Sequence, residues 1–301
     1  MDLALFFSQL FNGLSVASLY LLAALGLSLS FGLMRVINMA HGEMLMLGGY
    51  LAFLTLQLVP GFVGLLLALV FAFAGAALVG GVLQTTLIRR LTDRPLDTLL
   101  ATWGVSLILQ QLARDVFGPI GVEVRAPDWL NQSFQVGSGA LAGLTIPSTR
   151  LFILAVTAAV LAGLALLISK TRLGLLTRAT NQDRMMAAAC GIAVKRVDLL
   201  VFCLGSGIAG LAGVILALLG PVTPSVGQSY IVPAFLVVVM GGLGSIFGTT
   251  ISALLLGLLS ALSQIFVDVS VAQMLLLVFV ILFLQVRPQG VVSPPSRALD
   301  F

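Results

Sequence analysis

The sequence predicts an all-α polytopic membrane protein with about eight to nine transmembrane helices. Its 301 residues are 59% hydrophobic and only 9% charged, whereas soluble domains carry roughly one-quarter charged residues. The mean hydropathy is +1.16. Apolar runs of about 20 residues recur from end to end, and each is long enough as a helix to cross a hydrocarbon layer about 30 Å thick. No segment is left over for a soluble catalytic domain.

Nine spans are expected in chain order. The first, residues 8–33, is too long for a signal peptide and has neither a basic start nor a cleavage site. The others are expected at 36–58, 62–88, 96–118, 150–169, 198–219, 230–247, 249–267 and 271–286. The second and seventh have polar residues and glycines at one end, which favours re-entrant or discontinuous helices. The whole chain, 1–301, is expected to form a single transmembrane domain.

The charges predict how the spans are oriented. Basic residues cluster around 89–94, within 170–197, and near the carboxyl terminus at Arg287 and Arg297. The positive-inside rule makes these regions cytoplasmic, so an odd number of spans leaves the amino terminus outside. The segment 119–149 carries almost no net charge and becomes an outer loop, in which residues 133–147 are expected to form a small hairpin. Topology explains the net positive charge, and no basic groove for nucleic acid is expected.

Two patterns predict close helix packing and an internal repeat. Small residues four apart let helices approach closely, and they occur in two series: Ala72, Ala76 and Gly80, and Gly205, Ala209 and Gly213. In addition, HGEMLMLGGYL from His41 superposes on VGQSYIVPAFL from Val226, which pairs Gly42 with Gly227 and Glu43 with Gln228. Two pseudo-repeated halves with discontinuous helices point to a midplane site. Chance similarity is the alternative.

His41 and Glu43 are the first candidates for a functional site. A charge at the bilayer centre costs about 2.5–3.5 kcal/mol even on the lenient insertion scale, so such residues usually face the protein interior. Two positions apart on a helix, they cannot share one face. If the chain around Asn38 forms an irregular hinge, His41 braces it and Glu43 lies at the favourable start of the next helix. Bracing a helix break and contacting a solute both remain open.

Enzymatic chemistry is not expected. His41 and Glu43 form HGE rather than HExxH, and no second histidine is available to bind a metal. No GxSxG elbow occurs. The glycine-rich residues 241–248 lack the Lys-Ser/Thr of a phosphate loop. No metal or cofactor is therefore expected, and any ATP hydrolysis would belong to another chain.

The remaining polar residues of the spans favour a path for a neutral solute. They hydrogen-bond but carry no charge, and they include Thr102, Gln110, Gln228, Ser229 and Tyr230. A zwitterion would be expected to meet opposed charges or helix ends, whereas a small amide needs donors and acceptors only. Each of these residues could instead bridge helices.

Four motifs resemble the permease subunits of ABC importers of the branched-chain amino acid type. They are INMAHGEMLMLGGY (37–50), AAACGI (187–192), GQSYIV (227–232) and MGGLGSIFGT (240–249). Within that family, residues 95–118 and 178–192 look most like the urea permease branch. The resemblance implies import of urea or a short amide, with branched-chain amino acids as the alternative cargo. Where urea permeases tend to have an acid after GQSYIV, this chain has Pro233, which is expected to bend or start a helix.

The resemblance also implies partners and a place in the cell. A periplasmic solute-binding protein, a second related permease subunit and two cytoplasmic ATPase subunits would assemble with this chain in the bacterial inner membrane, with the carboxyl terminus cytoplasmic. The implied pathway residues are Asn38, His41, Glu43, Thr102, Gln228 and Tyr230. The segment 170–197 would carry the helix that docks on an ATPase, predicted from the helix-forming run 184–189 and a glycine stop. Its candidate residues are Arg184, Met185, Ala187, Ala188 and Gly191.

An alternative function from another class of transport protein is a stand-alone channel or a proton-coupled carrier. In that case Glu43 or His41 would be the titrating group.

Overall fold

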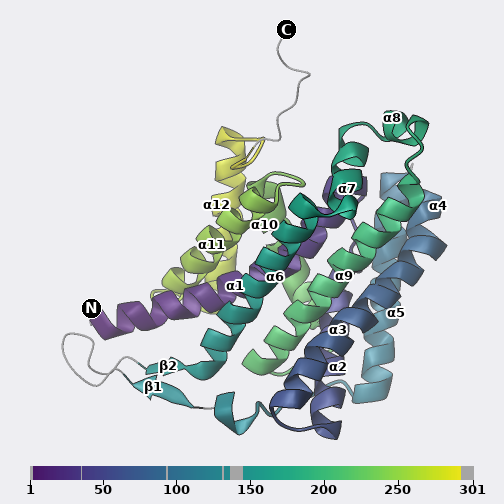
Figure 1. Cartoon of the computed structure of the whole chain (residues 1–301). Coiled ribbons are helices and arrows are strands. Elements are labelled where there is room, and N and C mark those ends of the chain that lie inside the picture. Colours follow the sequence, from purple (N-terminus) through teal and green to yellow (C-terminus); the bar gives the residue numbers. More distant parts are fainter. Residues whose placement is uncertain (1–2, 35, 93, 131, 136–144, 293–301) are drawn as a thin grey trace.

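The computed structural model describes residues 3–34, 36–92, 94–130, 132–135 and 145–292, and this part of the chain is almost entirely helical. Figure 1 shows the arrangement. The helices are α1 (Leu3–Met34), α2 (His41–Leu58), α3 (Phe62–Leu83), α4 (Arg89–Leu91), α5 (Pro95–Phe117), α6 (Ser148–Lys170), α7 (Arg172–Gln182), α8 (Arg184–Ala189), α9 (Val194–Leu219), α10 (Val226–Gly241), α11 (Ile246–Ser263) and α12 (Val269–Val286). A π-helical turn, Gln84–Ile88, joins α3 to α4, and a 3₁₀ turn covers Asp128–Leu130.

The predicted all-α polytopic fold is confirmed, and a helix lies at each of the nine expected spans. Among the described helices, six are long and apolar enough to cross a membrane, namely α1, α3 with its continuation to Leu91, α6, α9, α11 and α12. The expected seventh span, 230–247, is wrong at both ends. Helix α10 begins at Val226 and ends at Gly241, because Gly242 and Gly244 adopt positive φ angles of 96° and 82° before α11 starts.

The centre of the molecule is built by α1, α2, α3, α9, α10 and α11. Helix α1 packs most extensively against α11 and α9, and α9 also packs against α2 and α3. Helices α6 and α12 make fewer contacts with this centre and are mostly exposed in the isolated chain. Exposed apolar surface of that kind suits contact with lipid.

The two predicted series of small residues pack as expected. Ala72 and Ala76 of α3 lie against Gly210 of α9, and Gly80 lies against Ser206. The backbone of Gly205 lies in contact with the backbone of Gly26 in α1. Close approach of backbones is what small residues permit between membrane helices.

Basic and uncharged segments lie at opposite ends of the molecule. Figure 1 shows α4 and α8 at one end and the strands β1 (Ser133–Gln135) and β2 (Thr145–Pro147) at the other. The two strands pair antiparallel, with Ser133 opposite Pro147, as the hairpin prediction requires. Residues 136–144 and Arg297 lie outside the described residues. Which end faces the cytoplasm stays a prediction.

Candidate functional site

The chain doubles back into the molecule between α1 and α2. Residues 36–40 are not helical, and His41 begins α2 with its Nε2 3.2 Å from the carbonyl oxygen of Ala23. Ala23 lies about 16 Å before the end of α1, at 1.5 Å per helical residue. Helix α2 therefore starts in the interior beside the middle of α1. The discontinuity predicted for the second span is confirmed.

Buried protein groups satisfy the non-helical backbone of this break. The Met39 backbone N–H donates to Thr102 Oγ1 over 3.1 Å, and the Ala40 N–H donates to Asn38 Oδ1 over 3.0 Å. Non-helical backbone at membrane depth is tolerated only where protein or water supplies such partners. Asn38 and Thr102 are buried and bind this segment of the chain. Their place on the solute pathway stays a prediction.

Glu43 is held by the polar face of α5. Its Oε1 accepts from Ser106 Oγ and from Gln110 Nε2, each over 2.8 Å, and Gln110 Nε2 also lies 3.1 Å from Ser106 Oγ. Thr102, Ser106 and Gln110 are four residues apart and so share one face of α5. This face connects α5 to both the break and the start of α2.

His41 and Glu43 point to different helices, as their spacing predicts. Only 2% of His41 and 1% of Glu43 is exposed, so neither faces lipid. His41 reaches α1 and Glu43 reaches α5. His41 Nδ1 and Glu43 Oε2 have no hydrogen-bond partner among the described residues. Each residue keeps one polar atom uncommitted in the interior.

The starts of α2 and α10 meet at their superposed glycines. His41 and Val226, which the internal repeat superposes, are the first residues of the two helices. Gly42 and Gly227 lie in backbone contact, and a Cβ on either would collide with the other. The cavity beside them, lined by His41 and Tyr230, holds about 10 Å³. That is about the space of one water molecule, so the interior is closed here.

The six expected pathway residues therefore form two groups. Asn38, His41, Glu43 and Thr102 surround the α1–α2 break and the start of α2. Gln228 is exposed, and Tyr230 lies edge-on to Tyr20 of α1 with ring centroids 6.4 Å apart. Sequence reasoning did not identify Ser106, because a serine in an apolar helix gives no signal of its own.

The second expected site, the short helix α8, has the predicted bounds. Asp183 Oδ1 accepts from the Met186 backbone N–H over 2.9 Å and caps the first turn. Gly191, at a φ of 84°, ends the helix, and the Ile192 N–H donates to the Ala187 carbonyl over 3.0 Å. This pattern is a glycine C-cap of the Schellman type.

The candidate docking residues of α8 lie on different faces. Met185 is 85% exposed and Ala188 is also exposed, whereas Ala187 is buried. Met186, which is not among the predicted docking residues, is exposed as well. The structure thus presents two methionines and an alanine on the surface of a basic segment. Methionine is the adaptable apolar residue found at docking surfaces.

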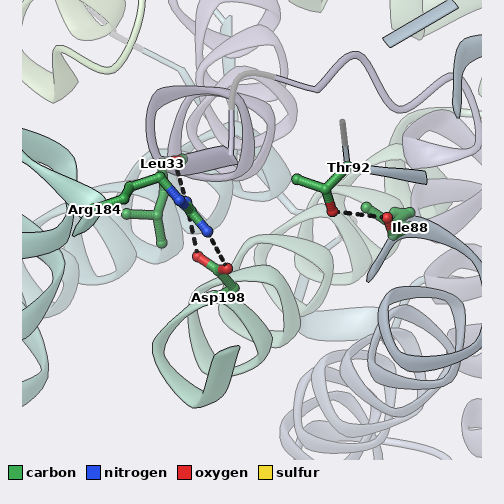
Figure 2. Close-up of polar contacts among 5 residues, drawn as sticks. All are labelled: Leu33, Ile88, Thr92, Arg184 and Asp198. Carbon is green, nitrogen blue, oxygen red and sulfur yellow. Dashed lines mark hydrogen bonds and ion pairs between the residues drawn. The ribbon is translucent and has the colours of Figure 1, made fainter. Parts of the chain in front are cut away.

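Arg184, the first residue of α8, ties it to two other helices (Figure 2). Its Nη1 and Nη2 donate to the two carboxylate oxygens of Asp198 in α9, over 3.2 and 2.6 Å. Nη1 also donates to the Leu33 carbonyl at the end of α1 over 2.9 Å. The last carbonyls of a helix lack partners within the helix, and a planar guanidinium suits this forked arrangement. Asp198 is buried beneath it.

Fold and site together define a polytopic α-helical membrane protein whose interior polar groups hold discontinuous helices. The family model described as "Branched-chain amino acid transport system / permease component" matches residues 9–285. The chain therefore belongs to this family of membrane permeases.

Related proteins match over nearly the whole chain or over part of it. The high-affinity branched-chain amino acid transport system permease protein BraD of Pseudomonas aeruginosa is 33% identical, over 97% of each chain. The permease protein LivH of Escherichia coli K12 is 31% identical, over 97% of this chain and 96% of its own. The ribose import permease protein RbsC of Bacillus subtilis is 33% identical over 43% of this chain and 41% of its own. No solved structure matches this chain.

Proposed function

We propose that this chain is the membrane-spanning permease subunit of an ATP-driven importer of branched-chain amino acids. The observation that carries the proposal is its similarity over 97% of both chains to a permease named for branched-chain amino acid transport. The buried polar groups at discontinuous helices suit a transporter, because irregular backbone in a membrane serves cavities and binding sites. The protein itself catalyses no covalent step.

Branched-chain cargo is better supported than urea. The expectation of urea rested on residues 95–118 and 178–192. The first of these is α5, whose polar face binds Glu43 and the α1–α2 break through Thr102, Ser106 and Gln110. Those donors are occupied in bracing the fold. The urea-like character of α5 thus has a structural use that requires no amide solute.

The proposed machine has partners on both sides of the membrane. A solute-binding protein delivers cargo at the end that carries β1 and β2, where a hollow of about 900 Å³ opens between the end of α2 and residues 123–129. A second permease subunit completes the pathway. Two ATPase subunits bind at the opposite, cytoplasmic end, and residues 1–301 act as one transmembrane domain. Transport alternates between outward-open and inward-open packings.

Helix α8 is the proposed contact with an ATPase. Its exposed Met185, Met186 and Ala188 provide the docking surface, and Arg184 connects that surface to α1 and α9. The end of α1 leads directly into the break before α2. A displacement of α8 is therefore passed to the segment that carries Asn38.

Competition for uptake tests the cargo. In cells that express the complete importer, excess unlabelled isoleucine or valine should abolish uptake of radiolabelled leucine, and equal urea should leave it unchanged. Cells that lack only this chain are the control. If unlabelled urea reduced the uptake of labelled urea and leucine did not, the amino-acid cargo would be rejected.

Reconstitution of this chain alone tests whether it works as an importer subunit. Solute flux through the chain without its partners would reject the importer and favour a channel or a carrier.

A further inference from the structure

Two adjoining hollows lie between α10 and α12 and are also lined by residues of α1 and α11. One has a volume of about 370 Å³ and the other about 180 Å³, and both are lined by Tyr20, Ser229 and Gln273. We name them together the α10–α12 groove. Small-molecule sites commonly have volumes of about 300–1,000 Å³. The groove is thus large enough for an amino acid, unlike the closed space beside His41.

The groove lies on membrane helices and its surface is mostly apolar, but it also contains a cluster of polar side chains. Gln228, Ser229, Gln273, Tyr230, Ser260 and Gln264 all line it, and no charged side chain is among the described residues that do. The side chains of Gln228, Ser229 and Gln273 make no hydrogen bond within the described part of the chain. Placing unpaired amides and a hydroxyl against hydrocarbon is strongly unfavourable, because nothing there can form a hydrogen bond with them. The groove therefore faces something other than lipid tails.

Pro233 leaves a backbone carbonyl of α10 without its usual donor. It lies inside α10 instead of starting it, and it lines the groove. Proline has no N–H, so it cannot donate to the carbonyl four residues earlier in its helix. That carbonyl belongs to Ser229. The carbonyl of Ser229, a residue that lines the groove, therefore lacks its usual helical donor.

The internal repeat shows how the second half differs from the first. Glu43 superposes on Gln228. In the first half, Gln110 of α5 donates to Glu43 and the pair is buried. In the second half, Gln228 of α10 and Gln273 of α12 line an open groove. One half uses these polar positions to bind helices together, and the other leaves them available.

We propose that the α10–α12 groove is this subunit's share of the solute pathway and that it receives a branched-chain amino acid. The amides and hydroxyls bind the polar head, and Val232, Leu236 and Leu277 contact the aliphatic tail. The lining has no charged side chain among its described residues, but it includes the first turns of α10 and α12 and the end of α11. Such helix ends can meet the opposite charges of an amino acid. The second permease subunit closes the open side. The identity of the cargo rests on the proposed function, whereas the place of the pathway does not.

Introduced cysteines test whether water reaches the α10–α12 groove. The background replaces the two native cysteines, Cys190→Ser and Cys203→Ala, and must keep leucine uptake. Gln228→Cys and Gln273→Cys are compared with Leu275→Cys and Val278→Cys, which are exposed on α12 but line neither hollow. The complete importer in proteoliposomes is treated with a charged, membrane-impermeant methanethiosulfonate. Because such reagents need a thiolate in water, the groove cysteines should react about tenfold faster or more.

Protection separates the pathway from the cargo. Leucine supplied with the binding protein and ATP should slow modification at 228 and 273. Protection by urea alone would support the groove as the solute site and reject the branched-chain cargo. Equal reactivity at all four positions, or protection by neither solute, would overturn the groove proposal while leucine uptake by the unmodified importer keeps the proposed function standing.

A kinetic measurement tests the groove without introduced cysteines, so it does not depend on an active cysteine-free importer. Gln273→Leu should raise the KM for leucine uptake about two- to tenfold, the effect of losing one hydrogen bond, with little change in maximal rate. Gln111→Leu is the matched control, because Gln111 is an exposed amide on α5 outside the groove. An unchanged KM for Gln273→Leu would contradict the proposal.

Discussion

At the scale of single residues, Glu43 shows how an acid can be retained inside a membrane protein. Its carboxylate meets a hydroxyl and an amide of α5 on one oxygen, and the other oxygen has no described partner. A carboxamide has the same shape and keeps one acceptor oxygen. The contacts made by Glu43 therefore require an oxygen and do not require a charge.

Glu43→Gln should keep most leucine uptake, whereas Glu43→Ala should lose it. The alanine variant leaves Ser106 and Gln110 without their acceptor, at about 1–3 kcal/mol for each unsatisfied buried group. Uptake normalised to the amount of protein in the membrane is the measurement. Loss of uptake in Glu43→Gln at normal membrane levels would instead support a proton-coupled carrier in which Glu43 titrates.

The sequence identified His41 and Glu43 but not their partners. A lone histidine and a lone acid within apolar runs are conspicuous because of their cost in a membrane. Ser106 is 63 residues from Glu43 in sequence, and no local pattern connects them. Asp198 escaped notice for the same reason, since its partner Arg184 lies in a different helix.

At the scale of elements, local signals decided which boundaries were predictable. The bounds of α8 follow from a capping aspartate and a glycine stop, both adjacent to it in sequence. The end of α10 was misplaced because GGLG at 241–244 is as apolar as a span. Only the positive φ angles of Gly242 and Gly244 reveal the turn. Glycine permits either conformation, so its presence did not decide between them.

Ala188→Glu tests the docking role of α8. Ala188 is exposed, so the variant should insert and fold normally. Leucine uptake should fall about thirtyfold if the change costs about 2 kcal/mol at a docking contact, while ATP hydrolysis by the assembled complex continues. Transport and hydrolysis are measured on the same proteoliposomes.

Ala187→Glu provides the contrast for that measurement. Ala187 is buried, so a carboxylate there should lower the amount of folded protein itself. Normal uptake by Ala188→Glu would place the ATPase contact elsewhere on the cytoplasmic surface.

At the scale of the whole molecule, the two halves meet where their equivalent helices begin. Gly42 and Gly227 are superposed by the repeat and touch in the structure. Repeated halves with discontinuous helices place their site at such a meeting point. The observed contact leaves no passage there, while the α10–α12 groove remains open beside it.

Gly42→Ala should lower the melting temperature and uptake together. The added Cβ collides with the Gly227 backbone, and overpacking of this kind costs about 1–3 kcal/mol. Gly104→Ala, on α5 with no atom within 4 Å of the added Cβ, should be neutral or more stable by about 0.5–1 kcal/mol. Thermal unfolding in detergent measures both. Equal melting of Gly42→Ala and the native protein would show that α2 and α10 do not pack here.

The break before α2 also dictates an order of events during synthesis. The groups that accept the Met39 amide and surround the Glu43 carboxylate lie 63 to 67 residues further along the chain. When the ribosome has just finished α2, these partners do not yet exist, so the Met39 amide and the Glu43 carboxylate have nothing to bind in the bilayer. Helix α2 should therefore wait beside the translocon until α5 emerges, and the two should enter the membrane together.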